Sequence, residues 1–184
     1  MSNQDCKAQA ERLKRRPASE PLPKLDRLMN LEEGRMARDI FWERDIYEQE
    51  LEKIFARCWL FVGHVSQIPK AGDFISTYMG EDNVLIVRQK DGSIRGFLNT
   101  CPHRGNKVTF ADAGNARQFI CNYHGWSFTI DGALKGMHAS EAYEASGMDK
   151  GQHGLHPVAQ IDDYKGLIFA TLDPEAPSLA EYLG

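Results

Sequence analysis

Two short loops in this sequence each pair one cysteine with one histidine. Cys101 and His103 lie in the run Cys-Pro-His-Arg-Gly, and Cys121 and His124 lie in the run Cys-Asn-Tyr-His-Gly-Trp. Seventeen residues separate His103 from Cys121, which is enough for one strand and a turn, so a β-sheet can bring both loops to one end. Thiolates and imidazoles are the ligands of zinc and of iron–sulfur centres. The spacing therefore predicts a metal centre.

The division of cysteines and histidines between the two loops distinguishes a zinc site from an iron–sulfur centre. Zinc modules more often present Cys-x-x-Cys pairs, with like ligands in each arm. A Rieske [2Fe–2S] centre needs two thiolates on one iron and two imidazoles on the other, and two mixed arms supply that set. Gly105 and Gly125 follow the histidines, and we expect them to let the backbone approach the cluster and donate N–H bonds to its sulfides. We interpret the motif as a Rieske cluster held by Cys101, His103, Cys121 and His124, with zinc or a metal-free coincidence as the alternatives.

The other cysteines and histidines lack a paired ligand spacing. Cys6 lies in the polar N-terminus, and Cys58 lies in an apolar stretch where a small buried hydrophobe is expected. His153 and His156 are three residues apart and could bind a metal from a helix, but the glycines and the proline around them argue against a helix. We expect all four remaining histidines to be structural or solvent-facing: His64, His138, His153 and His156.

Composition narrows the class of protein. The chain has 184 residues, 42% of them hydrophobic, and a net charge of -4, which predicts a soluble globular domain with extensions. Its basic residues are scattered, so neither nucleic acid nor a membrane surface is an expected partner. We find no leader-like start and no run of about 18 apolar residues. Four cysteines without an export signal predict a reducing compartment, hence a cytoplasmic protein without disulfides.

The pattern of the chain predicts a mostly β fold, an antiparallel sandwich or small barrel with an N-terminal helical extension. Three prolines in the first thirty residues predict an arm that is ordered only against something else. A helix is expected from Asp45 to about Arg57. Asp45 would be its N-cap, and Glu48 would complete a capping box. Strands are expected at 59–64, 74–79, 84–87, 94–98, 118–121, 126–130, 133–135, 157–161 and 166–172, with Asp-Gly turns at 91–92 and 131–132 and one helical turn within 140–152.

The ligand loops and several flanking stretches resemble the alpha subunits of Rieske non-haem iron ring-hydroxylating dioxygenases of the naphthalene and biphenyl type. The flanking stretches that carry the resemblance are 55–64, 68–69, 72–74 and 97–100. The match covers roughly residues 45–184. The resemblance implies an N-terminal arm and helix (1–57) that pack on a catalytic domain, a Rieske β-sandwich (58–178) and the start of a linker (179–184).

The same resemblance implies a function. A ferredoxin or reductase would reduce the cluster, and the electron would pass through His103 or His124 to a mononuclear iron that cis-dihydroxylates an aromatic substrate. In the family that iron lies in a C-terminal domain, where two histidines and one carboxylate bind it. It receives electrons from the cluster of a neighbouring alpha subunit, and the assembly is formed with or without a beta subunit. No such motif occurs here, so we expect a truncated subunit with no catalytic residue of its own. Under this interpretation the chain alone does not turn over.

Two other functions remain open from the sequence. A stand-alone Rieske ferredoxin leaves the helix before Arg57 and the arm unexplained, and a zinc-stabilised interaction module would be colourless. Respiratory Rieske proteins carry an extra cysteine in each loop, whereas Asn106 and Tyr123 stand in the corresponding places here. We therefore expect a potential toward the low end of the Rieske range, which spans about -150 to +300 mV.

Overall fold

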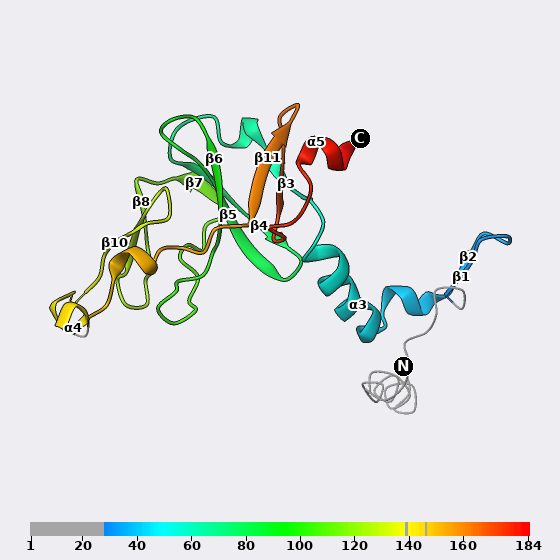
Figure 1. Cartoon of the computed structure of the whole chain (residues 1–184), viewed down its shortest axis with the longest axis horizontal. Helices are drawn as coiled ribbons and strands as arrows, with labels where there is room; N and C mark the ends of the chain where they lie inside the picture. Colours follow the sequence, from blue (N-terminus) through cyan, green and yellow to red (C-terminus); the bar gives the residue numbers. More distant parts are fainter. Residues whose placement is uncertain (1–27, 139, 146) are drawn as a thin grey trace, which may run out of the picture. The chain divides into compact units, whose positions relative to one another are not determined.

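The computed structural model describes residues 28–138, 140–145 and 147–184 (Figure 1). The chain divides into two compact units, Met1–Ile54 and Phe55–Gly184. The predicted arm before residue 28 and Cys6 lie outside the described residues. No helix in the described part of the chain is long and apolar enough to cross a membrane.

The first unit contains a small hairpin and the predicted helix. Its elements are β1 (Met29–Asn30), β2 (Arg35–Met36), the 3-10 helix η1 (Arg38–Phe41) and α3 (Arg44–Glu50), which continues as the π-helical segment η2 (Leu51–Phe55). The helix is confirmed, but the predicted capping box is wrong. Glu43 is the N-cap and makes no side-chain cap bond, while Asp45 lies inside the first turn. A carboxylate there still interacts favourably with the helix dipole.

The second unit is built from three antiparallel sheets, which confirms the predicted fold class (Figure 1). The four-stranded sheet has the order β6 (Ile94–Leu98), β5 (Asp82–Arg88), β4 (Asp73–Met79) and β7 (Ala113–Asn115). A three-stranded sheet has the order β11 (Gln160–Tyr164), β12 (Leu167–Thr171) and β3 (Leu60–His64). The third has the order β10 (Leu134–Gly136), β9 (Ser127–Thr129) and β8 (Gln118–Ile120).

Strand β5 is buried on both faces and thereby joins two cores. Leu85 and Val87 pack with the aromatic residues of β8 and β9, whereas Val84 and Ile86 pack with apolar residues of β3 and β12. All four side chains are 0% exposed. Because successive residues of a strand point to opposite faces, a continuous β-branched and leucine run fills both cores at once. The four-stranded sheet is the middle layer of a sandwich.

Both predicted Asp-Gly hairpins are present, between β5 and β6 and between β9 and β10. The last hairpin is displaced from its expected position. Tyr164 pairs with Leu167, so the turn lies on Lys165 and Gly166, and β11 includes the aspartates that we expected in the turn. Further short elements are η3 (Val65–Gln67), α4 (Ser140–Ala145) and η4 (Lys150–Gln152).

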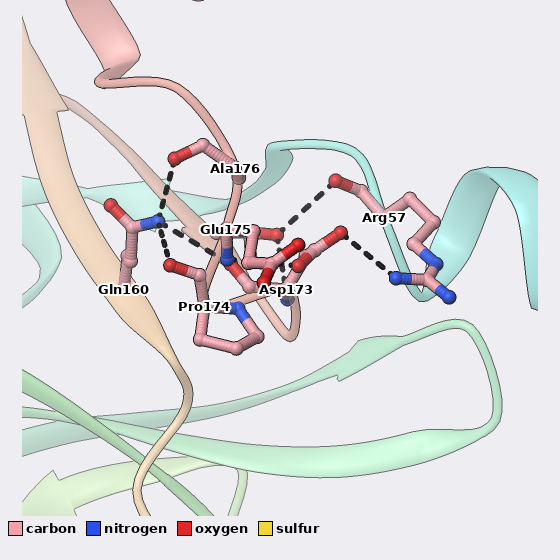
Figure 2. A network of polar contacts seen from close by, with 7 residues as sticks. Arg57, Gln160, Asp173, Pro174, Glu175 and Ala176 are labelled. Carbon is pink, nitrogen blue, oxygen red and sulfur yellow. Dashed lines mark hydrogen bonds and ion pairs between the residues drawn. The ribbon is translucent and has the colours of Figure 1, made fainter.

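A polar network fixes the segment that follows β12 (Figure 2). The Gln160 side-chain amide on β11 donates to the backbone carbonyls of Asp173, Pro174 and Ala176, at 3.3, 3.4 and 2.9 Å. Arg57 Nη1 lies 3.1 Å from Asp173 Oδ2. The segment leads into α5 (Leu179–Leu183), which has a capping box between its N-cap serine and third residue and buries its first leucine. The end of the described chain is therefore folded onto the sandwich.

Candidate metal centre

The two Cys-His loops close with the same backbone bonds. In the first, Cys101 N donates to the Asn106 carbonyl at 2.8 Å, and Gly105 N donates to the Cys101 carbonyl at 2.9 Å. In the second, Cys121 N donates to the Trp126 carbonyl at 2.8 Å, and the glycine after the histidine returns to the Cys121 carbonyl at 3.0 Å. Each loop is thus a closed turn that begins at its cysteine.

These bonds change the role that we expected for the glycines. Gly105 and Gly125 both adopt a positive φ, +74° and +70°, which the sharp turn requires. Their N–H groups are engaged with cysteine carbonyls rather than free for sulfides. The N–H groups that face sulfur belong instead to the residues two and three after each cysteine.

The two cysteines belong to one buried core cluster, and each lies where its loop begins. Both residues are only 2% exposed, and each thiol is close enough to the other to shift its pKa. Burial raises the pKa of the Cys101 thiol. Burial also acts to raise the pKa of Cys121, but the Tyr123 N–H, the Asn106 amide and the Cys101 thiol outweigh it, so that this pKa is lowered. Such N–H donors stabilise the thiolate, which is the form that binds metals.

The two imidazoles lie beside each other, with ring centroids 4.7 Å apart and planes at 76°. His103 Nε2 lies 3.4 Å from the Tyr143 hydroxyl, which leaves Nδ1 as the nitrogen available to a metal. Burial, together with the nearby His124 and Arg104, lowers the pKa of His103. A lowered pKa favours the neutral imidazole that metals require.

His124 carries the most direct indication that this site binds a further group. Its Nδ1 is buried and has no hydrogen-bond partner, and it stands out for this among the buried side-chain nitrogens and oxygens of the described residues. Burying a polar atom without a partner is costly, so such an atom is usually satisfied by an ion or ligand. The tilted ring of Tyr123, at a centroid distance of 3.9 Å, covers the imidazole.

The donor set fits two irons rather than one ion. Two thiols in contact and two adjacent imidazoles form a sulfur pair and a nitrogen pair, as a Rieske cluster requires. A tetrahedral zinc site would instead take all four ligands at one point.

Aromatic rings that the sequence analysis did not single out hold His103 in place. The Trp126 indole is stacked on the imidazole at a centroid distance of 4.7 Å, with 9° between the planes. Tyr143, on α4, meets His103 edge-on at 6.2 Å and meets Trp126 edge-on at 5.8 Å. The bulky residue after the second loop glycine is therefore part of the site.

Asn99 anchors the first loop and was also missed. Its Nδ2 donates to Asn83 Oδ1 at 2.6 Å and to the Thr109 carbonyl at 2.8 Å. Its Oδ1 accepts from the backbone N–H groups of Val108 and Thr109, both at 3.1 Å. The side chain is 1% exposed, so one buried amide ties both ends of the loop to β5. A buried asparagine at the end of an apolar strand is the signal that identifies it.

The remaining histidines have other surroundings, although the His153 ring meets Trp126 edge-on at a centroid distance of 6.2 Å. His64 caps η3 through its Nδ1, and His153 Nδ1 lies 2.9 Å from the Asp149 carbonyl. His138 and His156 are exposed. Cys58 is half-buried and lies against the Tyr182 hydroxyl.

Comparison with known proteins agrees with this geometry. Residues 58–160 match the family model of the Rieske [2Fe–2S] domain. The chain is 51% identical over 152 residues to the alpha subunit of biphenyl 2,3-dioxygenase from Rhodococcus jostii, which covers 82% of this chain and 32% of that protein. It therefore spans about a third of the length of that relative.

Solved structures give the same result. A naphthalene 1,2-dioxygenase bound to phenanthrene superposes with a TM-score of 0.76 and 43% identity, over 79% of this chain and 32% of the other. A quaternary ammonium Rieske monooxygenase superposes with a TM-score of 0.72 and 31% identity, over 79% and 39%. The chain belongs to the Rieske [2Fe–2S] family and is homologous to the N-terminal part of the alpha subunits of biphenyl and naphthalene dioxygenases.

Proposed function

We propose that Cys101 and Cys121 ligate one iron of the Rieske cluster and that His103 and His124 ligate the other. The observation that carries this assignment is the buried, unpartnered Nδ1 of His124 beside a second imidazole and next to a buried pair of sulfurs. The cysteine N–H donors and the lowered pKa of His103 both favour the protonation states that ligation needs. A cluster bound there exchanges one electron.

We further propose that the chain is the electron-transfer portion of an aromatic-ring-hydroxylating dioxygenase. It takes electrons from a ferredoxin or reductase and passes them to a mononuclear non-haem iron that cis-dihydroxylates an aromatic substrate. Relatives named for biphenyl, naphthalene and benzene, at 45–51% identity, support an aromatic substrate. The structure named for a quaternary ammonium monooxygenase is more distant, at 31%.

In this proposal the partner is the catalytic domain of a neighbouring alpha subunit, with or without a beta subunit. His103 and His124 are the exit for the electron, because both residues are only half-buried whereas both cysteines are buried. Helix α3 packs on the catalytic domain, and residues 179–184 begin the connection to it. What the chain itself supplies is a rigid frame that holds both imidazoles in place.

Metal analysis tests the ligand assignment. Anaerobically purified protein should contain two irons and two sulfides per chain and show the electron paramagnetic resonance signal of a Rieske centre once reduced. Cys121→Ser and His124→Ala should each lose the cluster, whereas His156→Ala, at an exposed histidine outside the four, should retain it. Stoichiometric zinc without sulfide, or full iron content in Cys121→Ser, would show the assignment to be wrong.

We also propose that the chain alone carries electrons without oxygenating a substrate. The proposal rests on the family resemblance, in which the two-His-one-carboxylate iron belongs to a C-terminal domain, and on the extent of the match, about a third of the biphenyl 2,3-dioxygenase alpha subunit. The test is a single turnover of reduced protein in air with naphthalene or biphenyl, followed by chromatography. A stoichiometric yield of cis-dihydrodiol would overturn this division of labour.

A further inference from the structure

The side chain of Asn106 crosses from the first Cys-His loop to the second. Its Nδ2 lies 2.8 Å from Asn122 Oδ1 and 3.6 Å from Cys121 Sγ, both in the other loop. A third contact, of 2.9 Å, joins it to the backbone carbonyl of Lys107. A carbonyl oxygen and a cysteine sulfur ligand both accept hydrogen bonds, so the nitrogen and not the oxygen of this amide faces them.

The position of this amide makes it more than a general surface contact. Asn106 is half-buried, and its backbone carbonyl closes the first loop on Cys101. One residue therefore holds the cysteine of its own loop through the main chain and reaches the cysteine of the other loop through its side chain. Asn122, which accepts from it, is the residue directly after Cys121.

We propose that Asn106 is a positioning residue that sets the reduction potential of the cluster, through the N–H bond from its amide to Cys121 Sγ. This inference rests on the proposed ligation by Cys121. Reduction adds negative charge to the iron and its sulfur ligands, and an N–H group aimed at a ligand sulfur stabilises that charge. Hydrogen bonds to sulfur are one of the determinants of iron–sulfur potentials. The amide therefore makes reduction easier and raises the potential.

The same contact ties the loops together without a covalent bond. The amide has two N–H groups for three acceptors, so the 3.6 Å contact to Cys121 Sγ shares a hydrogen with one of the two shorter contacts to oxygen. The tie and the effect on potential can be separated, because the first acts through Asn122 Oδ1 and the second through Cys121 Sγ.

The experiment compares the midpoint potentials of the purified, cluster-containing protein and its variants. Asn106→Leu keeps the size of the side chain and removes the donor. It should lower the equilibrium constant for reduction about threefold to tenfold. For one electron, this lowers the midpoint potential by about 28 to 59 mV. Asn106→Asp replaces the donor with a negative charge beside the sulfur and should lower the potential further. Asn122→Ala removes the tie but leaves the amide and the sulfur, so its potential should stay closer to that of the wild type.

Iron and sulfide content and the resonance spectrum establish that each variant contains an intact cluster. The proposal is supported if the midpoint potential is highest in the wild type, lower in Asn106→Leu and lowest in Asn106→Asp. Unchanged potentials in variants with full iron content overturn it. Loss of the cluster in both Asn106 variants, with retention in Asn122→Ala, also overturns it, because the residue then acts on cluster assembly. A wild-type protein without iron and sulfide would instead contradict the ligand assignment.

Discussion

The indole of Trp126 lies nearly parallel to the imidazole of His103, with ring centroids 4.7 Å apart and 9° between the planes. Trp126 is 2% exposed and belongs to the core that contains both loop cysteines. One face of the histidine ring is therefore held by a side chain that is itself fixed by core packing. Core packing therefore restrains the imidazole of His103, a proposed iron ligand, through its contact with Trp126.

The first prediction concerns this stacking. Trp126→Ala should reduce the free energy of unfolding by about 3–5 kcal/mol, since it empties a large buried site, and should release iron faster to a chelator. Trp126→Phe retains a ring against His103 and should be less affected on both counts. Denaturant unfolding and the rate at which the visible absorbance is lost measure the two effects. Equal rates of iron loss in Trp126→Ala and the wild type would show that the indole does not hold the ligand.

The second prediction uses two glycines in equivalent Asp-Gly turns. Gly92 and Gly132 have nearly the same φ, +85° and +88°, but a Cβ at Gly92 meets nothing within 4 Å, whereas one at Gly132 collides with the ring of Phe97. Gly92→Ala should cost about 1–2 kcal/mol, the penalty of a left-handed conformation. Gly132→Ala should cost clearly more, because Phe97 is in the core and 3% exposed. Equal losses of stability in denaturant unfolding would mean that the core around Phe97 rearranges to accept the Cβ with no further loss of stability.

These two turns also show which parts of the structure the sequence could predict. Asp-Gly between β-rich runs is a local signal, because few residues other than glycine adopt that backbone conformation, and both hairpins were placed correctly. Residue type and spacing likewise predicted that the two Cys-His loops meet, and the rings of His103 and His124 lie side by side. Hairpin β11–β12 was misplaced because two aspartates resembled turn residues, although they lie in a strand that pairs through Tyr164 and Leu167.

Other features depend on contacts that no local pattern encodes. Asn99 connects to Asn83 sixteen residues earlier and to Thr109 ten residues later, so its importance emerges only once the strands are paired. Tyr143 comes from a polar segment forty residues after His103. Strand β7 has three exposed residues and is recognisable as a strand only from its pairing with β4.

The third prediction follows from the bonds of Asn99. Asn99→Leu removes a buried amide and takes the partner away from the N–H groups of Val108 and Thr109 and from the Thr109 carbonyl, whereas Asn83 Oδ1 keeps its bond from the Ser76 hydroxyl. We expect a loss of about 3 kcal/mol in the free energy of unfolding, because each buried group left unsatisfied costs about 1–3 kcal/mol and some groups will find water. Asn115→Leu is the matched control. Asn115 is exposed, and its loss should cost about 1 kcal/mol or less. Similar losses for both variants would show that the amide does not anchor the first loop.

The last prediction concerns stability in acid. The pKa of Asp173 is lowered by the Glu175 N–H and by Arg57, against the opposing effect of burial. Since the pKa of Asp173 in the folded protein lies below that of the unfolded chain, this carboxylate stabilises the fold at a pH above the unfolded value of about 3.9. The contribution is lost as the pH falls through the folded-state pKa.

Asp173→Asn should therefore lower the unfolding temperature near pH 7, and its difference from the wild type should shrink toward pH 3. Arg57→Gln should have a smaller effect, because the arginine side chain is 63% exposed and solvent screens the pair. Comparing both variants with the wild type at each pH cancels the acid sensitivity of the metal site that all three share. A difference for Asp173→Asn that stays constant from pH 7 to pH 3 would show that the charge of Asp173 does not stabilise the segment it anchors.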